Sequence, residues 1–167
     1  MTTIRGAVLT VSDRASAGAY ADASGPLAVR LLGEHGIEAG LDVVPDDAEA
    51  IRRGILAAIA SGARFVLTCG GTGVGPRDIT PEVTAALLDQ AIPGVVDEVR
   101  RRGAAQVPTA VLSRAVAGIV RPPGGAPAFV VNAPGSTGGV RDTVAVVAPL
   151  VPHVLDQLAG GDHPRSG

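Results

Sequence analysis

The chain has 167 residues, 46% of them hydrophobic, which is enough for one compact domain with a substantial core. A net charge of −2 and an aromatic content of 2% argue against nucleic-acid binding, which requires a basic surface and rings for stacking. No stretch is long and apolar enough to span a bilayer, and an early strand leaves no room for a signal peptide, so we expect a cytoplasmic protein that binds neither nucleic acid nor membranes.

Strands alternate with helices along the first part of the chain. A buried parallel strand is expected at residues 5–11, and Ser24, Gly25 and Pro26 open an amphipathic helix that stops near residue 36. A second strand is expected at residues 40–44, a second helix begins at residues 46–49, and a third strand covers residues 65–68.

The second part of the chain continues this alternation. Helices are expected at residues 81–90, 93–103 and 139–158, and strands at 110–112, 115–120 and 128–131. The pattern predicts one α/β domain over residues 1–159, with a mostly parallel sheet and helices on both faces. Residues 160–167 are polar and rich in glycine and should form a disordered tail.

A glycine-rich loop at residues 69–79 follows the third strand. Gly70, Gly71, Gly73 and Gly75 allow close approach of a ligand, and Thr80 and Pro81 predict an N-cap and a first helical residue just beyond. These features favour phosphate, whereas Asp78 repels it unless a divalent cation bridges the two. The loop is not a Walker A motif, because the chain contains no lysine. The alternative is a simple turn in which Asp78 makes an Asx turn.

Polar residues follow the other strands as well. The loops that begin at Ser12, Asp46, Gly70 and Asn132 should converge, because the carboxyl ends of parallel strands share one edge. Asp46 also fits a helix cap, Asp13 a turn former, and Ser113 with Arg114 a polar hinge between strands. These alternatives stay open on the residue pattern alone.

Several other residues have simpler interpretations. Cys69 is expected to be a small buried hydrophobe rather than a nucleophile. The isolated positions of His35, His153 and His163 predict neither a general base nor a metal site. The arginines at residues 100–102 are expected to decorate the solvated end of a helix.

Residues 68–82, which read TCGGTGVGPRDITPE, closely resemble the signature of the molybdopterin adenylyltransferase family, with its MogA-like and MoaB-like branches. The resemblance extends to residues 10–13, 44–47, 92–94, 108–114 and 132–135, and so covers nearly the whole chain. It implies a three-layer α/β/α domain that assembles as a trimer rather than a hexamer, and that acts with other molybdenum cofactor biosynthesis proteins. It also implies a reaction in which the terminal phosphate of molybdopterin attacks the α-phosphate of Mg-ATP, giving adenylyl-molybdopterin and pyrophosphate.

The resemblance also assigns roles to residues. Asp46 and Asp78 match the two essential aspartates that act with Mg²⁺, which favours catalysis over capping for Asp46. The residues that match substrate-binding positions, for molybdopterin or ATP, are Ser12, Asp13, Gly70, Gly71, Thr72, Gly73, Ser113, Arg114, Asn132, Pro134, Gly135 and Ser136.

Two departures from the family pattern stand out. Gly103 occupies a position where many relatives carry serine, which predicts the loss of one hydroxyl contact to substrate. The turn at residues 134–137 resembles MoaB-like members, and this leaves open a second function class: a carrier or scaffold that binds molybdopterin without adenylating it.

Overall fold

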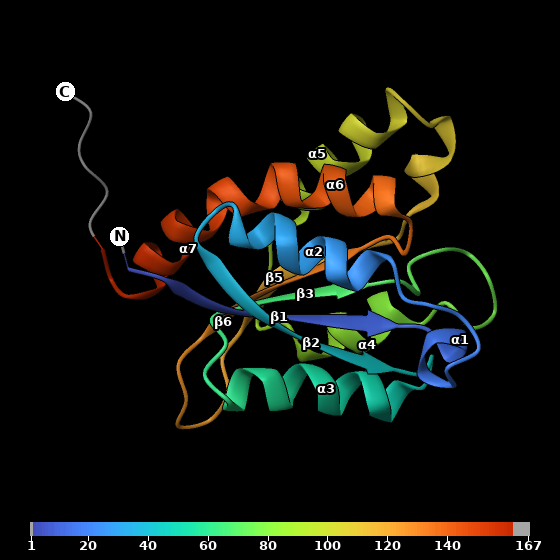
Figure 1. Ribbon diagram of the computed structural model, residues 1–167. Coiled ribbons are helices and arrows are strands. Elements are labelled where there is room, and N and C mark those ends of the chain that lie inside the picture. Colours follow the sequence, from blue (N-terminus) through green and yellow to red (C-terminus); the bar gives the residue numbers. More distant parts are fainter. Residues whose placement is uncertain (1, 162–167) are drawn as a thin grey trace.

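The computed structural model describes residues 2–161, in which helices cover both faces of a central sheet (Figure 1). The strands are β1 (Ile4–Val11), β2 (Ile37–Val44), β3 (Phe65–Cys69), β4 (Gln90–Ala91), β5 (Ala117–Val120) and β6 (Ala128–Ala133). The helices are α1 (Asp13–Ser16), α2 (Ser24–Gly33), α3 (Ala48–Ala60), α4 (Thr80–Leu87), α5 (Pro93–Ala104), α6 (Thr137–Val147) and α7 (Val151–Leu158). Two 3₁₀ helices, η1 (Pro108–Leu112) and η2 (Ala148–Leu150), complete the elements of this part of the chain.

The sheet has the strand order β2-β1-β3-β6-β5-β4. The four strands β2, β1, β3 and β6 run parallel, whereas β5 runs antiparallel to both β6 and β4. The predicted mostly parallel sheet is therefore confirmed. Its parallel part sends four carboxyl ends to the same edge.

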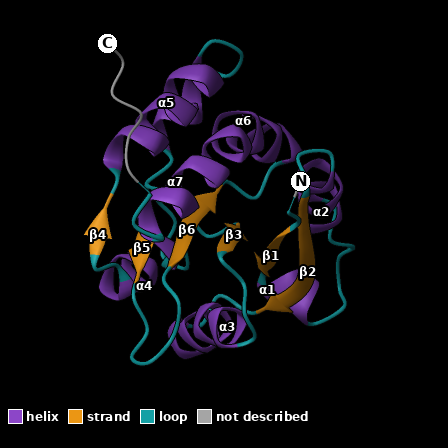
Figure 2. Cartoon of the chain, turned by 90° about the vertical axis from the view of Figure 1, so that its left-hand side faces the viewer, coloured by secondary structure: helices purple, strands orange, loops and turns teal. Residues whose placement is uncertain are grey.

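Helices lie on both faces of the sheet and give the molecule three layers (Figure 2). A hydrophobic core lies on each face of the sheet, between it and the helices. Along β3, Phe65 and Leu67 pack into the core under α2, α5, α6 and α7, whereas Val66 packs into the core under α3. Every residue of β3 is buried, as expected for a central parallel strand covered on both faces. The α/β/α sandwich predicted from the sequence is confirmed.

Several predicted boundaries were wrong. The expected strand at residues 110–112 is the 3₁₀ helix η1, which begins at Pro108 and leaves Val111 and Leu112 exposed rather than paired in the sheet. The expected closing helix is interrupted by η2, because Pro149 and Pro152 have no backbone N–H for a continuous α-helix.

Other elements differ in extent. The strand expected at residues 40–44 starts at Ile37 because all eight residues of β2 pair with β1. The strand expected at 115–120 shortens to β5, and the one expected at 128–131 extends to Ala133. The helix expected at 81–90 ends at Leu87, so that Gln90 and Ala91 can pair with β5 as the short edge strand β4.

Most of the predicted tail, residues 162–167, lies outside the described residues. Within residues 2–161 we find no helix with the length and apolar character needed to cross a bilayer.

Cys69 ends β3 and is buried, which confirms its assignment as a core residue. Burial raises the pKa of the Cys69 thiol to about 12. The reactive thiolate is therefore about one part in ten thousand at pH 8. We expect an aromatic disulfide reagent to leave the native protein unmodified and to modify one thiol per chain after unfolding in denaturant. Modification of the native protein at the rate of a free thiol would contradict this burial.

Candidate active site

Loops that follow β1, β2, β3 and β6 line two adjoining cavities at the carboxyl edge of the sheet. The larger cavity, of about 680 Å³, lies between the glycine-rich loop, α5, η1 and the start of α6. The smaller, of about 540 Å³, lies between the same loop and the segments after β1 and β2. The predicted convergence of the strand ends is thereby confirmed.

Gly70 and Gly71 turn the chain at the end of β3, and both have positive φ angles, of 108° and 68°. The N–H of Gly70 donates to the carbonyl oxygen of Ala133 at 3.0 Å. A Cβ at position 70 would collide with the carbonyl oxygen of Val11, so the turn passes closely between the ends of β1 and β6. Only glycine combines this backbone conformation with this close approach.

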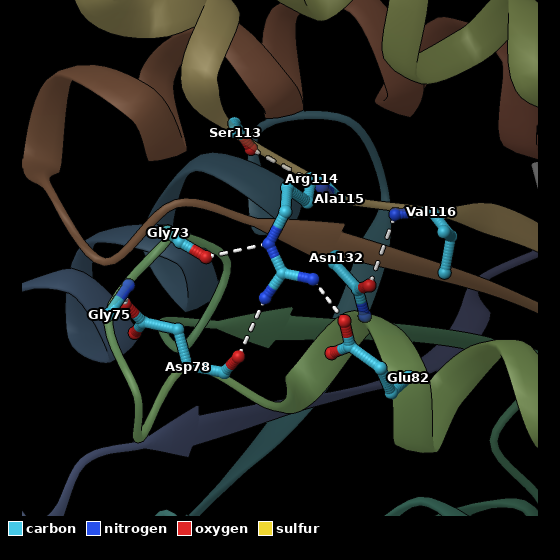
Figure 3. Close-up of polar contacts among 9 residues, drawn as sticks. All are labelled: Gly73, Gly75, Asp78, Glu82, Ser113, Arg114, Ala115, Val116 and Asn132. Atoms are coloured by element: carbon cyan, nitrogen blue, oxygen red, sulfur yellow. Dashed lines mark hydrogen bonds and ion pairs between the residues drawn. The ribbon is translucent and has the colours of Figure 1, made fainter.

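Arg114 lies beside the glycine-rich loop and forms hydrogen bonds to it (Figure 3). Its Nε donates to the carbonyl oxygen of Gly73 at 2.8 Å, one Nη donates to that of Asp78 at 2.6 Å, and the other pairs with Glu82. Its backbone N–H donates to the carbonyl oxygen of Thr72 at 2.8 Å. These bonds make Arg114 a residue that positions the loop, and its expected contact with substrate stays a prediction.

Asp13, Asp46 and Arg77 tie three loops into a ring. The N–H of Asp13 donates to Oδ2 of Asp46, and the N–H of Asp46 donates to Oδ1 of Asp13, both at 2.9 Å. Nε of Arg77 donates to Oδ2 of Asp13 at 2.6 Å, and an Nη donates to the carbonyl oxygen of Asp46 at 3.2 Å. Asp13 thus orients Asp46. The helix cap is Asp47, whose carboxylate accepts from the N–H of Ala50, so the capping alternative for Asp46 is wrong.

The pKa values of these two linked carboxyl groups shift in opposite directions. The hydrogen bond from Arg77 lowers the pKa of Asp13 below its usual value. Burial raises the pKa of Asp46, and the negative charges of Asp13 and Asp78 raise it further. Ionised Asp46 is therefore poorly solvated and lies near another carboxylate, an environment that a bound cation would relieve.

The two cavities meet along Gly71, Asp78, Gly135 and Ser136, which line both of them. Ser136 caps α6 by accepting from the N–H of Gly139 at 3.0 Å, so the positive end of that helix faces the junction. A ligand in either cavity would reach this junction, where glycine backbone, a helix N-terminus and Asp78 lie together.

The donors near this junction fit a divalent cation. Asp46 and Asp78 offer carboxylate oxygens, the ligands that Mg²⁺ prefers. Within residues 2–161 no group of three or more His, Cys, Asp or Glu side chains is placed to hold a metal ion, so a cation bound by Asp46 and Asp78 would need further ligands. A buried hydroxyl that has no partner, Oγ1 of Thr80, lies beside Asp46 at Gly71. The donor set is thus hard, oxygen-only and suited to magnesium.

Most of the residues assigned to the site by sequence resemblance line a cavity. The larger cavity contains Gly71, Thr72, Gly73, Asp78, Ser113, Pro134, Gly135 and Ser136. The smaller contains Ser12, Asp46, Gly70, Gly71, Asp78, Gly135 and Ser136. Asp13, Arg114 and Asn132 line neither cavity. The first two position the loops, as described above, and Asn132 has a different place.

Asn132 is buried within β6, where its side-chain amide joins three elements. Its Oδ1 accepts from the N–H of Val116 at 3.1 Å, and its Nδ2 donates to the hydroxyls of Thr68 and Thr84 at 2.8 and 2.9 Å. This arrangement favours a role in holding β3, β6 and α4 together beneath the site over direct contact with substrate.

Replacing Asn132 with alanine should lower the free energy of unfolding by about 3 kcal/mol, because buried partners of the amide lose their hydrogen bonds. Urea denaturation measures this change. The control is Ser61→Ala, which removes an exposed hydroxyl bond to Ala58 and should change stability by less than about 0.5 kcal/mol. Unchanged stability combined with weaker substrate binding would instead identify Asn132 as a substrate contact.

The sequence interpretation of the arginine triplet missed Arg100. Arg101 and Arg102 pair with Glu98 and Asp142 near the surface, as a solvated helix end requires. Arg100 also pairs with an acid, Asp97, but it lines the larger cavity and donates to the carbonyl oxygens of Ser113 and Ala115 at 2.9 and 3.3 Å. Arg100 follows the buried Val96 by four residues and therefore lies on the inner face of α5. This spacing was overlooked because three consecutive arginines are usually interpreted as a solvated surface.

The sequence analysis also missed one acidic and one aromatic side chain that line the smaller cavity, Asp22 and Tyr20. Asp22 accepts from the hydroxyl of Thr10 at 2.7 Å and from the N–H of Gly25 at 3.0 Å, and Tyr20 lies beside it in the cavity lining. Both stand in a segment without regular structure between α1 and α2. No periodic pattern pointed to them.

Gly103 lines the larger cavity, close to η1. A Cβ at this position would lie 2.9 Å from the Cβ of Ala110 and 3.5 Å from Oδ2 of Asp142. A serine here would therefore require η1 to shift. The absence of a side chain at Gly103 lets η1 pack closely on α5, and the loss of a hydroxyl contact to substrate stays a prediction.

Comparison with known proteins identifies the family. The family model described as "Probable molybdopterin binding domain" matches residues 7–153. The chain is 34% identical to a molybdopterin adenylyltransferase of Helicobacter pylori, over 96% of this chain and 90% of the relative. It is 36% identical to that of Pyrococcus furiosus, over 92% and 90%. In contrast, it spans about half the length of two bifunctional molybdenum cofactor biosynthesis proteins, covering 48% of the one from Synechococcus elongatus at 38% identity.

Solved structures agree with this result. A molybdopterin biosynthesis protein from Mycobacterium abscessus superposes with a TM-score of 0.86 at 40% identity, over 95% of this chain and 98% of that one. The tungsten cofactor synthesizing protein MoaB from Pyrococcus furiosus superposes with a TM-score of 0.87 at 34% identity, with the same coverage. In sequence and in fold, the chain belongs to the family of molybdopterin-binding domains that includes the molybdopterin adenylyltransferases.

Proposed function

We propose that this protein transfers the adenylyl group of ATP to the terminal phosphate of molybdopterin and releases pyrophosphate, as part of molybdenum cofactor biosynthesis. The observation that carries the proposal is the junction of two cavities along Gly71, Asp78, Gly135 and Ser136. Two adjoining compartments would let two phosphorylated substrates bind side by side, with their phosphates meeting at the junction. Relatives that match nearly all of the chain are named for this activity.

The residues of the junction act by binding and orientation. The glycine backbone and the N-terminus of α6 favour phosphate oxygens, and the ring of Asp13, Asp46 and Arg77 fixes the carboxylate of Asp46 beside them. Both substrates are anions, so these groups lower the repulsion that opposes their approach.

Asp46 and Asp78 are the residues that would hold Mg²⁺ in this proposal. When bound, Mg²⁺ supplies positive charge to phosphate oxygens at the reacting centre. The remaining requirement, a nucleophile, is met by an ionised phosphate, which needs no general base. Accordingly, neither cavity is lined by a histidine from the described part of the chain.

Incubation of the purified protein with molybdopterin and Mg-ATP tests the proposal. Pyrophosphate release should require molybdopterin, ATP and a divalent cation together. Tight binding of molybdopterin without any release of pyrophosphate would instead support the carrier or scaffold function. That alternative does not explain why two carboxylates stand beside a phosphate-binding loop.

We also propose a homotrimer, in preference to a hexamer. Exposed apolar side chains on η1 and just before it, Val107, Val111 and Leu112, suit contact with another copy, as do Leu41 and Val43 on the edge strand β2. Light scattering should give a mass three times that of the 16.6 kDa chain. A cytoplasmic location, and association with other molybdenum cofactor biosynthesis proteins, are further parts of this proposal.

A further inference from the structure

Tyr20 is the one exposed aromatic side chain in residues 2–161. The whole chain has one tyrosine, two phenylalanines and no tryptophan. Phe65 and Phe129 are fully buried and pack against each other, with ring centroids 5.7 Å apart, whereas Tyr20 is 62% exposed. Tyr20 also lines the smaller cavity. Its ring is therefore a large apolar surface that a ligand in this cavity could cover.

The backbone on either side of Tyr20 is held in place. The N–H of Tyr20 donates to the carbonyl oxygen of Arg14 at 3.2 Å. Two residues later, the carboxylate of Asp22 accepts from the hydroxyl of Thr10 at 2.7 Å and from the N–H of Gly25 at 3.0 Å, which ties the segment to β1 and α2. The ring is thus carried by a segment that is anchored at both ends.

Arg14 contacts the Tyr20 ring from one side. Its guanidinium carbon lies over the ring, 5.8 Å from the centroid, which is within the range of a cation–π contact. Arg14 lines neither cavity, whereas Tyr20 lines the smaller one. The guanidinium therefore orients the ring from outside this cavity and leaves the side that borders the cavity to a ligand.

The place of Tyr20 relative to the junction decides which part of a ligand it meets. Phosphate groups belong at the junction, and Tyr20 stands outside that shared wall because it lines only the smaller cavity. Asp46, one of the two carboxylates that would hold Mg²⁺, also lines only the smaller cavity. This cavity therefore suits Mg-ATP, with its phosphates at the junction and its nucleoside directed away from it.

We propose that the ring of Tyr20 stacks on the adenine base of ATP in the smaller cavity, and so favours a nucleotide over a bare polyphosphate. This inference rests on the proposed function, in which ATP is one of the substrates. A purine is flat and has a π surface on both faces, so an aromatic ring binds it without needing a charge or a hydrogen bond. Molybdopterin also contains a flat heterocycle, and the experiments below distinguish the two.

Calorimetric binding of Mg-ATP in the absence of molybdopterin tests the proposal. Tyr20→Ala should weaken binding by about tenfold, whereas Tyr20→Phe, which keeps the ring, should stay within about twofold of the original chain. Mg-tripolyphosphate, which has no base, should bind alike to all three proteins. The control is Ser16→Ala, an exposed residue of α1 that lines neither cavity, and it should bind Mg-ATP as the original chain does.

Two calorimetric results would overturn the proposal. One is equal affinity of Tyr20→Ala and the original chain for Mg-ATP. The other is an equal loss of affinity for Mg-tripolyphosphate, which would place the effect at the phosphates instead of the base. Because the ring is exposed, Tyr20→Ala should keep the melting temperature of the original chain, and a large fall would also count against a role in binding alone.

Nuclear magnetic resonance gives a second readout. Since the chain has a single tyrosine, every ring signal of a tyrosine-labelled sample comes from Tyr20. Mg-ATP should shift these signals upfield, because a stacked base shields the ring protons, and Mg-tripolyphosphate should not. Signals that shift with molybdopterin but not with Mg-ATP would assign the ring to the pterin and contradict the proposal.

Failure of this inference can be told from failure of the proposed function. A loss of Mg-ATP affinity in Tyr20→Ala, in a protein that binds ATP but does not adenylate molybdopterin, would reject the proposed function and keep Tyr20 as the contact to the base. Adenylyl transfer by Tyr20→Ala with an unchanged KM for ATP would keep the proposed function and reject the stacking role.

Discussion

Replacing Asp78 with asparagine should lower the rate of adenylyl transfer by at least about a thousandfold, equivalent to about 4 kcal/mol of transition-state stabilisation. The amide keeps an oxygen that can accept from the N–H of Gly75, so the loop should retain its conformation. What it removes is a negative charge at the place where the two cavities meet. Asp46→Asn should have a similar effect, because Asp46 lies in the same acidic pair.

Steady-state release of pyrophosphate measures this loss, and melting temperatures establish that the variants are folded. The matched control is Asp156→Asn, an exposed carboxylate on α7, at the end of the sheet opposite the junction (Figure 1). It should retain full activity. If Asp78→Asn transferred adenylyl groups as fast as the original protein, the proposed role of the carboxylate pair would be wrong.

Replacing Gly70 with alanine should lower the free energy of unfolding by about 3 kcal/mol and abolish substrate binding. The residue has a φ of 108°, which alanine rarely adopts, and its Cβ would collide with the carbonyl oxygen of Val11. The backbone would have to move away from β1, and the loop that contacts both cavities would move with it.

Urea denaturation and equilibrium binding of ATP measure the two effects. Gly33→Ala is the control, because a Cβ at the last residue of α2 would meet no atom within 4 Å. That change should stabilise the protein by up to about 1 kcal/mol through the higher helix propensity of alanine. A Gly70→Ala variant as stable as the unmodified chain would show that the turn is not constrained in this way.

The layered fold could be predicted because its signals are local. Phe65, Val66 and Leu67 form an uninterrupted apolar run, and Ile51, Ile55 and Ile59 recur at helical spacing, so each element displays its own burial pattern. The prediction of a strand at η1 was wrong because it also relied on local signals alone. Val111 and Leu112 resemble a short strand, and only the absence of a neighbouring strand in the folded chain distinguishes them.

Part of the candidate site was predictable because its loop needs an unusual backbone conformation. Gly70 and Gly71 stand out in the sequence because positive φ angles and close approaches select glycine. The carboxylate Asp78 stands out because it contradicts an otherwise anion-binding loop. These signals are carried by single residues.

Roles that depend on distant partners were not predictable. For Arg114 the expected contact with substrate stays a prediction, whereas the bonds of its guanidinium to Gly73, Asp78 and Glu82, more than thirty positions away in the sequence, were not foreseen. Thr80 was expected to cap α4, whereas the N-cap is Ile79 and the Thr80 hydroxyl faces Gly71 and Asp46. Neither contact has a periodic signature, because each is created by the packing of loops from different strands.

Mass spectrometry of the pterin product tests the central claim most directly. Molybdopterin incubated with the protein and Mg-ATP should gain the mass of one adenylyl group, with one pyrophosphate released for each molecule modified, and Asp78→Asn should abolish both. Molybdopterin recovered unmodified from a folded protein that binds both substrates would contradict adenylyl transfer and establish a binding function instead.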